Sequence, residues 1–259
     1  MTETLEFAVK LARQAGELLL GHFTLSGTHA HLKEDRSVVT EADIAADRLI
    51  ANAIHSTYPE DGLLSEELYN VSPLEKKAVW VIDPLDGTTN FSLGLPIWGI
   101  SIARLVDGFP ALGVLYFPTL GELYTAQSGL GASLNGTPIH AAGSPSNPTA
   151  TFFACCSRTH RRYQINIPYK TRILGSAAYN LCAVARGMAI VGFEATVKLW
   201  DIAAGWLLIH EAGGVIETFE GQQPFPLSAG KDYSRQSFPV LSGATTELVA
   251  LARSQIIPK

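Results

Sequence analysis

Hydrophobic residues near the N-terminus recur every three or four positions along the chain. From Leu5 to Phe23 they fall on one face, which predicts an amphipathic helix packed against a core. A second helix is predicted from Thr40, because the apolar residues that follow keep the same spacing. Asp43 comes three residues after Thr40 and suits a capping box, in which two side chains bond backbone amides at the helix start. This cap alone gives Asp43 a structural role.

The pattern changes to that of β-strands between residues 63 and 126. Residues 63–68 predict a short strand that ends in two glutamates, and the unbroken apolar run 78–82 predicts a buried strand. Three further apolar runs, separated by turn residues, predict an antiparallel meander over residues 97–106, 111–117 and 123–126.

The last third of the chain alternates short apolar runs with helical patterns. These segments are 151–156, 172–174, 177–188, 189–193, 202–212, 215–217, 240–242 and 246–252. Alternation of this kind is typical of a layered α/β unit with helices packed on a sheet. Small residues and prolines gather in 141–148, which predicts a boundary between an N-terminal α+β subdomain, 1–143, and a C-terminal α/β subdomain, 144–259.

Composition and charge narrow the classes of protein. With 259 residues, 47% of them hydrophobic, the chain can form one large domain or two closely packed ones. A net charge of −5 without a basic block argues against nucleic-acid binding. The short basic cluster at residues 158–162 is more typical of a solvated loop, although a small anionic substrate could use it.

Neither a membrane span nor a secretion signal is predicted. No segment reaches the roughly 20 consecutive apolar residues of a transmembrane helix, and the N-terminus lacks a positive region followed by an apolar core. We therefore expect a cytoplasmic protein. Cys155, Cys156 and Cys182 lack metal-ligand spacing and are expected to be buried free thiols.

Two carboxylates follow the apolar run 78–82 and are the strongest chemical signal. Asp83 and Asp86 are held in a turn by Pro84, which fixes its own φ, and by Gly87, which permits a conformation that a Cβ would obstruct. Neighbouring carboxylates repel unless they are protonated or share a cation, and hard oxygen ligands suit Mg²⁺ or Mn²⁺. The alternative is that Asp and Gly here only supply turn chemistry.

Two other acidic positions could likewise be either functional or only structural. Asp201 begins a predicted helix that is otherwise apolar, where it is either a functional carboxylate or a simple N-cap. Glu66 and Glu67 are adjacent on an extended segment, so their side chains point to opposite faces. At most one of them is therefore expected to face the same site as Asp83.

Four segments together resemble the inositol monophosphatase family of metal-dependent phosphomonoesterases. They are residues 80–91, residues 200–214, the pair Glu66 and Glu67, and residues 39–43. The two long motifs match over most of their positions, in the right order and at the right separation. The resemblance implies a layered αβαβα sandwich shared with fructose-1,6-bisphosphatase, a homodimer, activation by Mg²⁺ and sensitivity to Li⁺.

The resemblance also assigns roles at the metal centre. It implies two or three Mg²⁺ ions, with Mn²⁺ as a possible replacement. The first ion would be bound by Glu66, Asp83 and the Leu85 carbonyl. The second ion would be bound by Asp83, Asp86 and Asp201, and a third ion by Glu66 and waters. Thr88, paired with Asp43, would orient the attacking water. Two cations held close together can stabilise both the attacking and the leaving oxygen of an in-line displacement.

Substrate contacts are implied at several further positions. The amides of Gly87 and Thr88 would receive the phosphate, with Asp86 and Asp201 beside it, and no arginine clamp is expected. Gly175, Ser176 and Ala177 match the segment that lines the substrate pocket, and Glu194 matches an acidic residue that hydrogen-bonds a substrate hydroxyl. A loop carrying Lys33 resembles a flexible loop of the metal site. Lys198 departs from the animal enzymes near the pocket, which puts inositol itself in question.

The sequence leaves open the identity of the substrate and one alternative class of protein. Inositol 1-phosphate is the leading substrate of the expected Mg²⁺-dependent phosphatase, among small polyol and sugar monophosphates. Histidinol phosphate, a sugar bisphosphate or a phosphorylated nucleotide are the alternatives on the same fold. The alternative of another class is a non-catalytic regulatory protein that binds metal and phosphate.

Overall fold

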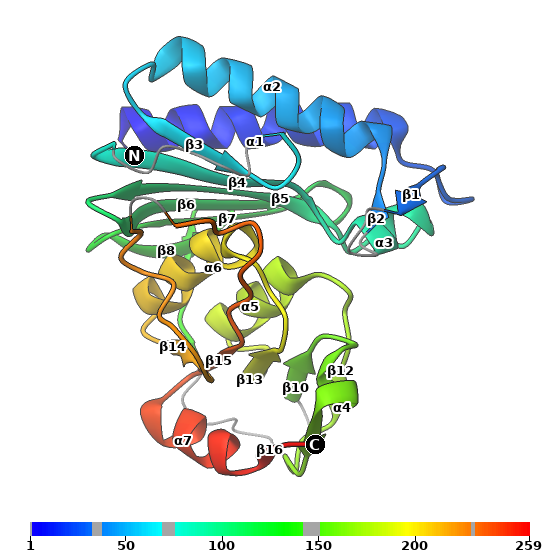
Figure 1. The fold of residues 1–259 in the computed structure, drawn as a ribbon, viewed down its shortest axis with the longest axis vertical. Coiled ribbons are helices and arrows are strands. Elements are labelled where there is room, and N and C mark those ends of the chain that lie inside the picture. Colours follow the sequence, from blue (N-terminus) through cyan, green and yellow to red (C-terminus); the bar gives the residue numbers. More distant parts are fainter. Residues whose placement is uncertain (1, 33–37, 69–75, 142–150, 229–230) are drawn as a thin grey trace.

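The protein is built from five alternating layers of helices and sheets (Figure 1). The computed structural model describes residues 2–32, 38–68, 76–141, 151–228 and 231–259. From one side to the other lie a helix pair, a seven-stranded sheet, a second helix pair, a five-stranded sheet and an outer helix. This order confirms the predicted αβαβα sandwich. The predicted boundary at 143/144 and the Lys33 loop lie outside the described residues.

The first layer consists of α1 (Glu3–His22) and α2 (Glu41–Thr57), which pack their apolar faces on the large sheet. The predicted capping box is present at the start of α2. The Thr40 amide donates to Asp43 Oδ2 over 2.8 Å, and the Asp43 amide donates to Thr40 Oγ1 over 3.4 Å. The box orients Asp43 while leaving its other carboxylate oxygen available for a second contact.

The second layer is a sheet with the strand order β3-β4-β5-β6-β7-β8-β9. Its strands are β3 (Gly62–Ser65), β4 (Ala78–Asp86), β5 (Gly99–Val106), β6 (Phe109–Phe117), β7 (Glu122–Gln127), β8 (Gly131–Leu134) and β9 (Thr137–Pro138). β3 and β4 are parallel and all later pairs are antiparallel, as expected of the meander.

Strand β4 is longer than the sequence predicts, because it continues through both aspartates to Asp86. Asp83 pairs with Ser101 and Asp86 with Gly99, with a shift of register between the two aspartates. Pro84 lies at this shift and has no amide hydrogen for the ladder. The irregularity redirects the two carboxylates at the end of the strand, as bulges near active sites do.

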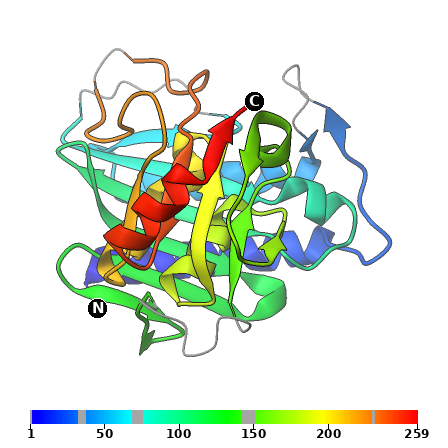
Figure 2. The ribbon, with the colours of Figure 1, turned by 90° about the horizontal axis from the view of Figure 1, so that it is seen from below.

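The inner helices and the second sheet come from the later part of the chain. The helices are α5 (Ala177–Ala185) and α6 (Leu199–Glu211), and the sheet has the order β12-β10-β13-β15-β14. Its strands are β10 (Phe152–Cys155), β12 (Thr171–Arg172), β13 (Ala189–Glu194), β14 (Val215–Thr218) and β15 (Val240–Gly243). Helix α7 (Thr246–Ser254) crosses the outer face of this sheet (Figure 2).

Short elements complete the structure. They are β1 (His31–Leu32), β2 (Val38–Val39), α3 (Thr88–Ser92), the 3₁₀ turn η1 (Pro118–Leu120), α4 (Thr159–Arg162), β11 (Tyr163–Ile165) and β16 (Ile256–Pro258). β1 pairs with β2, and β11 pairs with β16. Among the described residues, no helix is both long and apolar enough to span a membrane.

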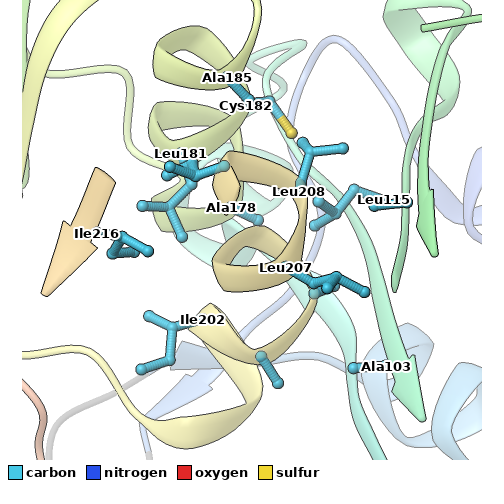
Figure 3. Packing of buried hydrophobic residues seen from close by; sticks show 14 of the residues in the cluster. Ala103, Leu115, Ala178, Leu181, Cys182, Ala185, Ile202, Leu207, Leu208 and Ile216 are labelled. Carbon is cyan, nitrogen blue, oxygen red and sulfur yellow. The ribbon is translucent and has the colours of Figure 1, made fainter. Parts of the chain in front are cut away.

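The layers are joined by an apolar interface between α5, α6 and the large sheet (Figure 3). Leu207 and Leu208 of α6 belong to the same buried cluster as Ala103 and Leu115 of the sheet. Cys182 of α5 is also buried here as a free thiol, as the sequence predicts. Burial of this interface holds the start of α6, and therefore Asp201, against the end of β4.

Close packing at Gly113 gives a test of this interface. A Cβ at Gly113 would lie 2.9 Å from the carbonyl oxygen and 3.1 Å from the Cα of Ala204 on α6. Gly113→Ala is expected to lower the free energy of unfolding by about 1–3 kcal/mol through overpacking, measured by urea denaturation. In the control Gly21→Ala the new Cβ meets nothing within 4 Å, so no destabilisation is expected. Equal stability of both variants would contradict the tight contact.

Candidate active site

Three carboxylates from distant parts of the chain meet at one end of the large sheet. Oxygens of Glu66, Asp83 and Asp201 lie within 4.8 Å of one another. Glu66 follows β3, Asp83 lies on β4 and Asp201 is the third residue of α6. The Glu66 amide donates to the Ile82 carbonyl over 3.2 Å, which continues the pairing of β3 with β4 and fixes Glu66 beside Asp83. The structure thus brings together three of the predicted metal ligands.

The backbone of Glu67 has a different partner. Its amide donates to Asp47 Oδ2 over 3.1 Å, and the Ser65 hydroxyl donates to Asp47 Oδ1 over 3.1 Å. Asp47 is fully buried and anchors the end of β3 on α2. Glu66, and not Glu67, belongs to the carboxylate cluster, as expected for adjacent residues of an extended segment.

Buried negative charge in this cluster favours a cation. Asp83 is 2% exposed, and burial followed by repulsion from Glu66 raises the pKa of both Asp83 and Asp201 well above the ordinary range. No lysine or arginine of the described residues forms an ion pair with either aspartate. An all-oxygen donor set at this spacing suits a hard divalent ion. The residues therefore fit the metal that the resemblance implies.

Asp86 lines the same cleft but has protein partners of its own. Its carboxylate accepts hydrogen bonds from the Ser176 hydroxyl, from the Ala177 amide over 3.2 Å and from the Ala178 amide over 3.3 Å. These bonds join the end of β4 to the first turn of α5. Burial raises the pKa of Asp86 to about 6, against the lowering effect of the Ser176 bond. Asp86 lies outside the Glu66–Asp83–Asp201 group, and its ligand role, like the ligand roles of those three residues, stays a prediction.

The Thr88 hydroxyl lies between α2 and the end of β4. Its Oγ1 is 3.1 Å from Asp43 Oδ1 and 2.9 Å from the Leu85 carbonyl oxygen, so its hydrogen can be donated to either acceptor. Gly87, just before it, has a φ of 91°, and a Cβ there would lie 3.0 Å from the Ile97 carbonyl oxygen. Burial raises the pKa of Asp43 to about 6. The structure therefore links Thr88 to Asp43, as predicted.

Two cavities adjoin at this end of the sheet. One, of about 240 Å³, is a cleft over the carboxylates and is lined by Glu66, Asp83, Leu85, Asp86, Gly87, Thr88 and Asp201 among others. The other, of about 220 Å³, is lined by Cys156, Gly175, Ser176, Ala177, Asn180, Glu194 and Asp201 among others. Arg158, Gly175 and Asp201 line both. A phosphoryl group over the carboxylates could thus carry an organic part into the second cavity.

Arg158 belongs to the basic segment for which the sequence leaves open a solvated loop or use by a small anionic substrate. It is exposed, as expected of a loop residue, and it also lines both cavities, which places a cation beside the carboxylate cleft. The two interpretations are compatible at this residue. The sequence signal for a functional role of Arg158 is its position shortly after the buried strand β10. Residues just beyond the end of a buried strand often line a binding site.

The start of α6 corrects one alternative. Lys198 follows Val197, which lines the second cavity, and its ammonium donates to the Ser234 carbonyl over 2.7 Å. Asp201 is not the N-cap, which is Lys198, but the third helical residue. Asp201 Oδ2 accepts from the Lys198 amide over 2.8 Å, so one oxygen stabilises the helix start while the carboxylate also joins the cluster.

The raised pKa values predict that the metal-free protein loses stability as pH rises. Asp43 and Asp86 have folded pKa values near 6 against 3.8 ordinarily. Each group's contribution to the free energy of unfolding is up to about 3 kcal/mol. This contribution is fully present below about pH 4 and is lost as the pH rises through 6. We expect the melting temperature in excess chelator to fall by several degrees between pH 5 and 7.5. Mg²⁺ should reduce this fall, and a melting temperature that rises with pH in chelator would contradict the expectation.

Comparison with known proteins shows which family the chain resembles. The model of the inositol monophosphatase family matches residues 1–257. A Chlorobaculum parvum protein named histidinol-phosphatase is 36% identical over 234 residues, which cover 86% of this chain and 88% of that protein. Escherichia coli Nus factor SuhB is 36% identical over 239 residues, which cover 88% and 90%.

Solved structures agree with this match. Thermotoga maritima IMPase superposes with a TM-score of 0.79 at 30% identity and covers 98% of each chain. Inositol monophosphatase from Anabaena gives a TM-score of 0.75 at 27% identity, over 97% of this chain and 94% of that one. The chain belongs to the inositol monophosphatase family. This membership supports a phosphomonoesterase and leaves the substrate open, because the relatives carry different names.

Proposed function

We propose that the protein is a Mg²⁺-dependent phosphomonoesterase that acts on a small polyol or sugar monophosphate. The observation that carries the proposal is the cluster of Glu66, Asp83 and Asp201 beside a cavity large enough for a small organic group. Inositol 1-phosphate is the leading substrate. The cluster supports hydrolysis because phosphoryl transfer depends mainly on positioning and charge neutralisation.

The metal would be held by the carboxylates of Glu66, Asp83, Asp86 and Asp201 and by the Leu85 carbonyl. Bound divalent ions supply charge neutralisation for the phosphoryl oxygens and lower the pKa of a water. Asp86 would have to turn from its bonds with Ser176 and α5, or share its oxygens with them. These carboxylates must also lose their protons, so metal affinity should fall at low pH.

Thr88 and Asp43 would orient the attacking water and hold its proton. The Thr88 hydroxyl already contacts Asp43 Oδ1, so it can accept a hydrogen bond from the water while donating to the carboxylate. The amides of Gly87 and Thr88 would bind phosphate oxygens across the cleft. Arg158 would add positive charge at the edge of the same cleft. Together these groups would align the phosphoryl group with the water.

A panel of phosphomonoesters tests the proposal. Purified protein should release phosphate from inositol 1-phosphate, histidinol phosphate, a sugar bisphosphate and a phosphorylated nucleotide at different rates. The ester with the highest kcat/KM identifies the preferred substrate. Each reaction is run with Mg²⁺ and with excess chelator. Undiminished hydrolysis in chelator would rule out the metal-dependent mechanism.

A non-catalytic regulatory protein is the second candidate. It is favoured by one observation, the 36% identity to proteins named Nus factor SuhB. In that case calorimetry should show binding of a phosphomonoester with Mg²⁺, while no member of the panel is hydrolysed. The Thr88–Asp43 contact favours the enzyme, because a site that only binds metal and phosphate does not need a hydroxyl–carboxylate pair to orient a water.

A further inference from the structure

Asp47 is a buried acid in the interior of α2, outside the carboxylate cluster. It is 0% exposed and lines neither cavity. No lysine or arginine of the described residues forms an ion pair with it. Aspartate is a poor helix former in a helix interior, and burial of a polar group is costly unless its hydrogen bonds are made. The reason for an aspartate at this position therefore lies outside α2.

The Asp47 carboxylate accepts hydrogen bonds from both sides of Glu66. The Ser65 hydroxyl donates to Oδ1 over 3.1 Å. The amides of Glu67 and Leu68 donate to Oδ2 over 3.1 Å and 3.3 Å. Asp47 thus holds the residue before Glu66 and the two residues after it.

Glu66 has the least regular backbone of the three clustered carboxylates. Asp83 lies within β4, which pairs with β3 and β5, and Asp201 lies within α6. Residues 66–68, in contrast, belong to no helix or strand. The Glu66 amide bonds the Ile82 carbonyl over 3.2 Å, which fixes one side of the peptide. The bonds to Asp47 fix the segment on the side of α2.

One face of α2 supports two parts of the site. Asp43 and Asp47 are four residues apart, so their side chains project from the same face of the helix. Asp43 Oδ1 lies 3.1 Å from the Thr88 hydroxyl, whereas Asp47 bonds the chain around Glu66. Because the two carboxylates have different partners, their contributions can be separated experimentally.

We propose that Asp47 is a positioning residue of the metal centre, which raises the affinity for Mg²⁺ by orienting Glu66 through the bonds to its neighbours. Asp47 contacts neither the metal nor the substrate. Groups that orient metal ligands typically contribute about 10- to 100-fold to metal affinity or activity. This inference rests on the proposed function, because Glu66 is one of the residues proposed to hold the metal.

Asp47→Ala removes the three bonds and leaves Glu66 in place. The dissociation constant of Mg²⁺, measured by calorimetry, is expected to rise about 10- to 100-fold. At saturating Mg²⁺ most of kcat should return, because the bound ion then holds Glu66 itself. Thr88→Ala should behave in the opposite way, with a lower kcat and nearly unchanged affinity for Mg²⁺.

Ile54→Ala is the control for a general loss of stability. Ile54 is buried on the same helix, about two turns beyond Asp47, and lines neither cavity. Its truncation leaves a gap in the core, so the melting temperature should fall. The dissociation constant of Mg²⁺ should stay at the wild-type value.

Asp47→Asn and Asp47→Glu separate positioning from charge. Asparagine removes the charge, but its oxygen can accept from the two amides while its NH₂ group donates to the Ser65 hydroxyl. Glutamate keeps the charge, but its longer side chain displaces the carboxylate. Positioning predicts that Asp47→Asn retains the affinity for Mg²⁺ and that Asp47→Glu weakens it. Should Asp47→Ala not fold, this comparison decides the question.

The outcomes distinguish the inference from the proposed function. A folded Asp47→Ala with wild-type affinity for Mg²⁺ would make Asp47 merely structural and overturn the inference. The reverse order, with affinity retained by Asp47→Glu and lost by Asp47→Asn, would also overturn it. A wild type that binds Mg²⁺ and hydrolyses no ester of the panel would overturn the proposed phosphatase function, while the same titrations would still decide the role of Asp47. No binding of Mg²⁺ by the wild type would overturn both.

Discussion

Asp201→Asn is expected to lower kcat for phosphate release by about 1,000-fold, which corresponds to about 4 kcal/mol of transition-state stabilisation. The change removes one negative charge from the Glu66–Asp83–Asp201 cluster. The asparagine oxygen can still accept the bond from the Lys198 amide, so the start of α6 should be retained. The measurements are phosphate release at saturating Mg²⁺ and substrate, the melting temperature, and Mg²⁺ affinity by calorimetry.

Asp107→Asn is the matched control for this variant. Asp107 is an exposed turn residue with a φ of 50°, a conformation that asparagine also tolerates, and it lines neither cavity. Its activity should equal that of the wild type. Full activity of Asp201→Asn would remove Asp201 from the proposed ligands.

Asp86→Asn extends the test to the aspartate that lies outside the cluster. A ligand role predicts a large loss of kcat with weakened Mg²⁺ binding, as for Asp201→Asn. If Asp86 only anchors α5 through Ser176 and the two amides, the variant should lose stability and keep its Mg²⁺ affinity. The two roles are thus distinguished by metal affinity.

Thr88→Ala is expected to lower kcat by about 100-fold, the lower end of the range for proton transfer by a positioned group. The variant loses the hydroxyl that contacts Asp43 Oδ1 and the Leu85 carbonyl, so the water would no longer be oriented. KM and Mg²⁺ affinity should change by less, because the carboxylate cluster is untouched. Steady-state phosphate release as a function of substrate and Mg²⁺ measures all three quantities.

Thr88→Ser provides the control for the Thr88 prediction. Serine keeps the hydroxyl and loses only a methyl group, so most of kcat should be retained. If Thr88→Ser were as inactive as Thr88→Ala, packing of the methyl group and not the hydroxyl would be responsible. Unchanged kcat in Thr88→Ala would exclude Thr88 from the reaction.

The parts of the site that the sequence predicts are those with a strong local signal. The capping box at Thr40 and Asp43 follows from spacing within one helix turn, and the buried strand before Asp83 follows from an unbroken apolar run. The wider set of ligands came from resemblance to a family, since Asp83 and Asp201 are far apart in the chain and meet only when α6 packs on the sheet.

Tertiary contacts explain the errors and omissions. The bond from the Lys198 ammonium to the Ser234 carbonyl joins residues 36 positions apart, so the local sequence does not predict it. Asn180 reads in the sequence as one polar residue within an apolar helix, and only the packing of α5 against β13 places it beside Glu194. The extension of β4 to Asp86 was missed because Pro84 normally interrupts a strand, whereas here a shift of register accommodates it.

Titration of Mg²⁺ into the fully chelated wild-type protein tests the central claim most directly, with phosphate release from inositol 1-phosphate and from the best ester of the panel as the readout. We predict no measurable turnover before Mg²⁺ is added, a saturable rise as it binds, and a much weaker rise with Asp201→Asn. Turnover that is the same in chelator as in saturating Mg²⁺ would contradict a metal-dependent phosphatase built on Glu66, Asp83 and Asp201.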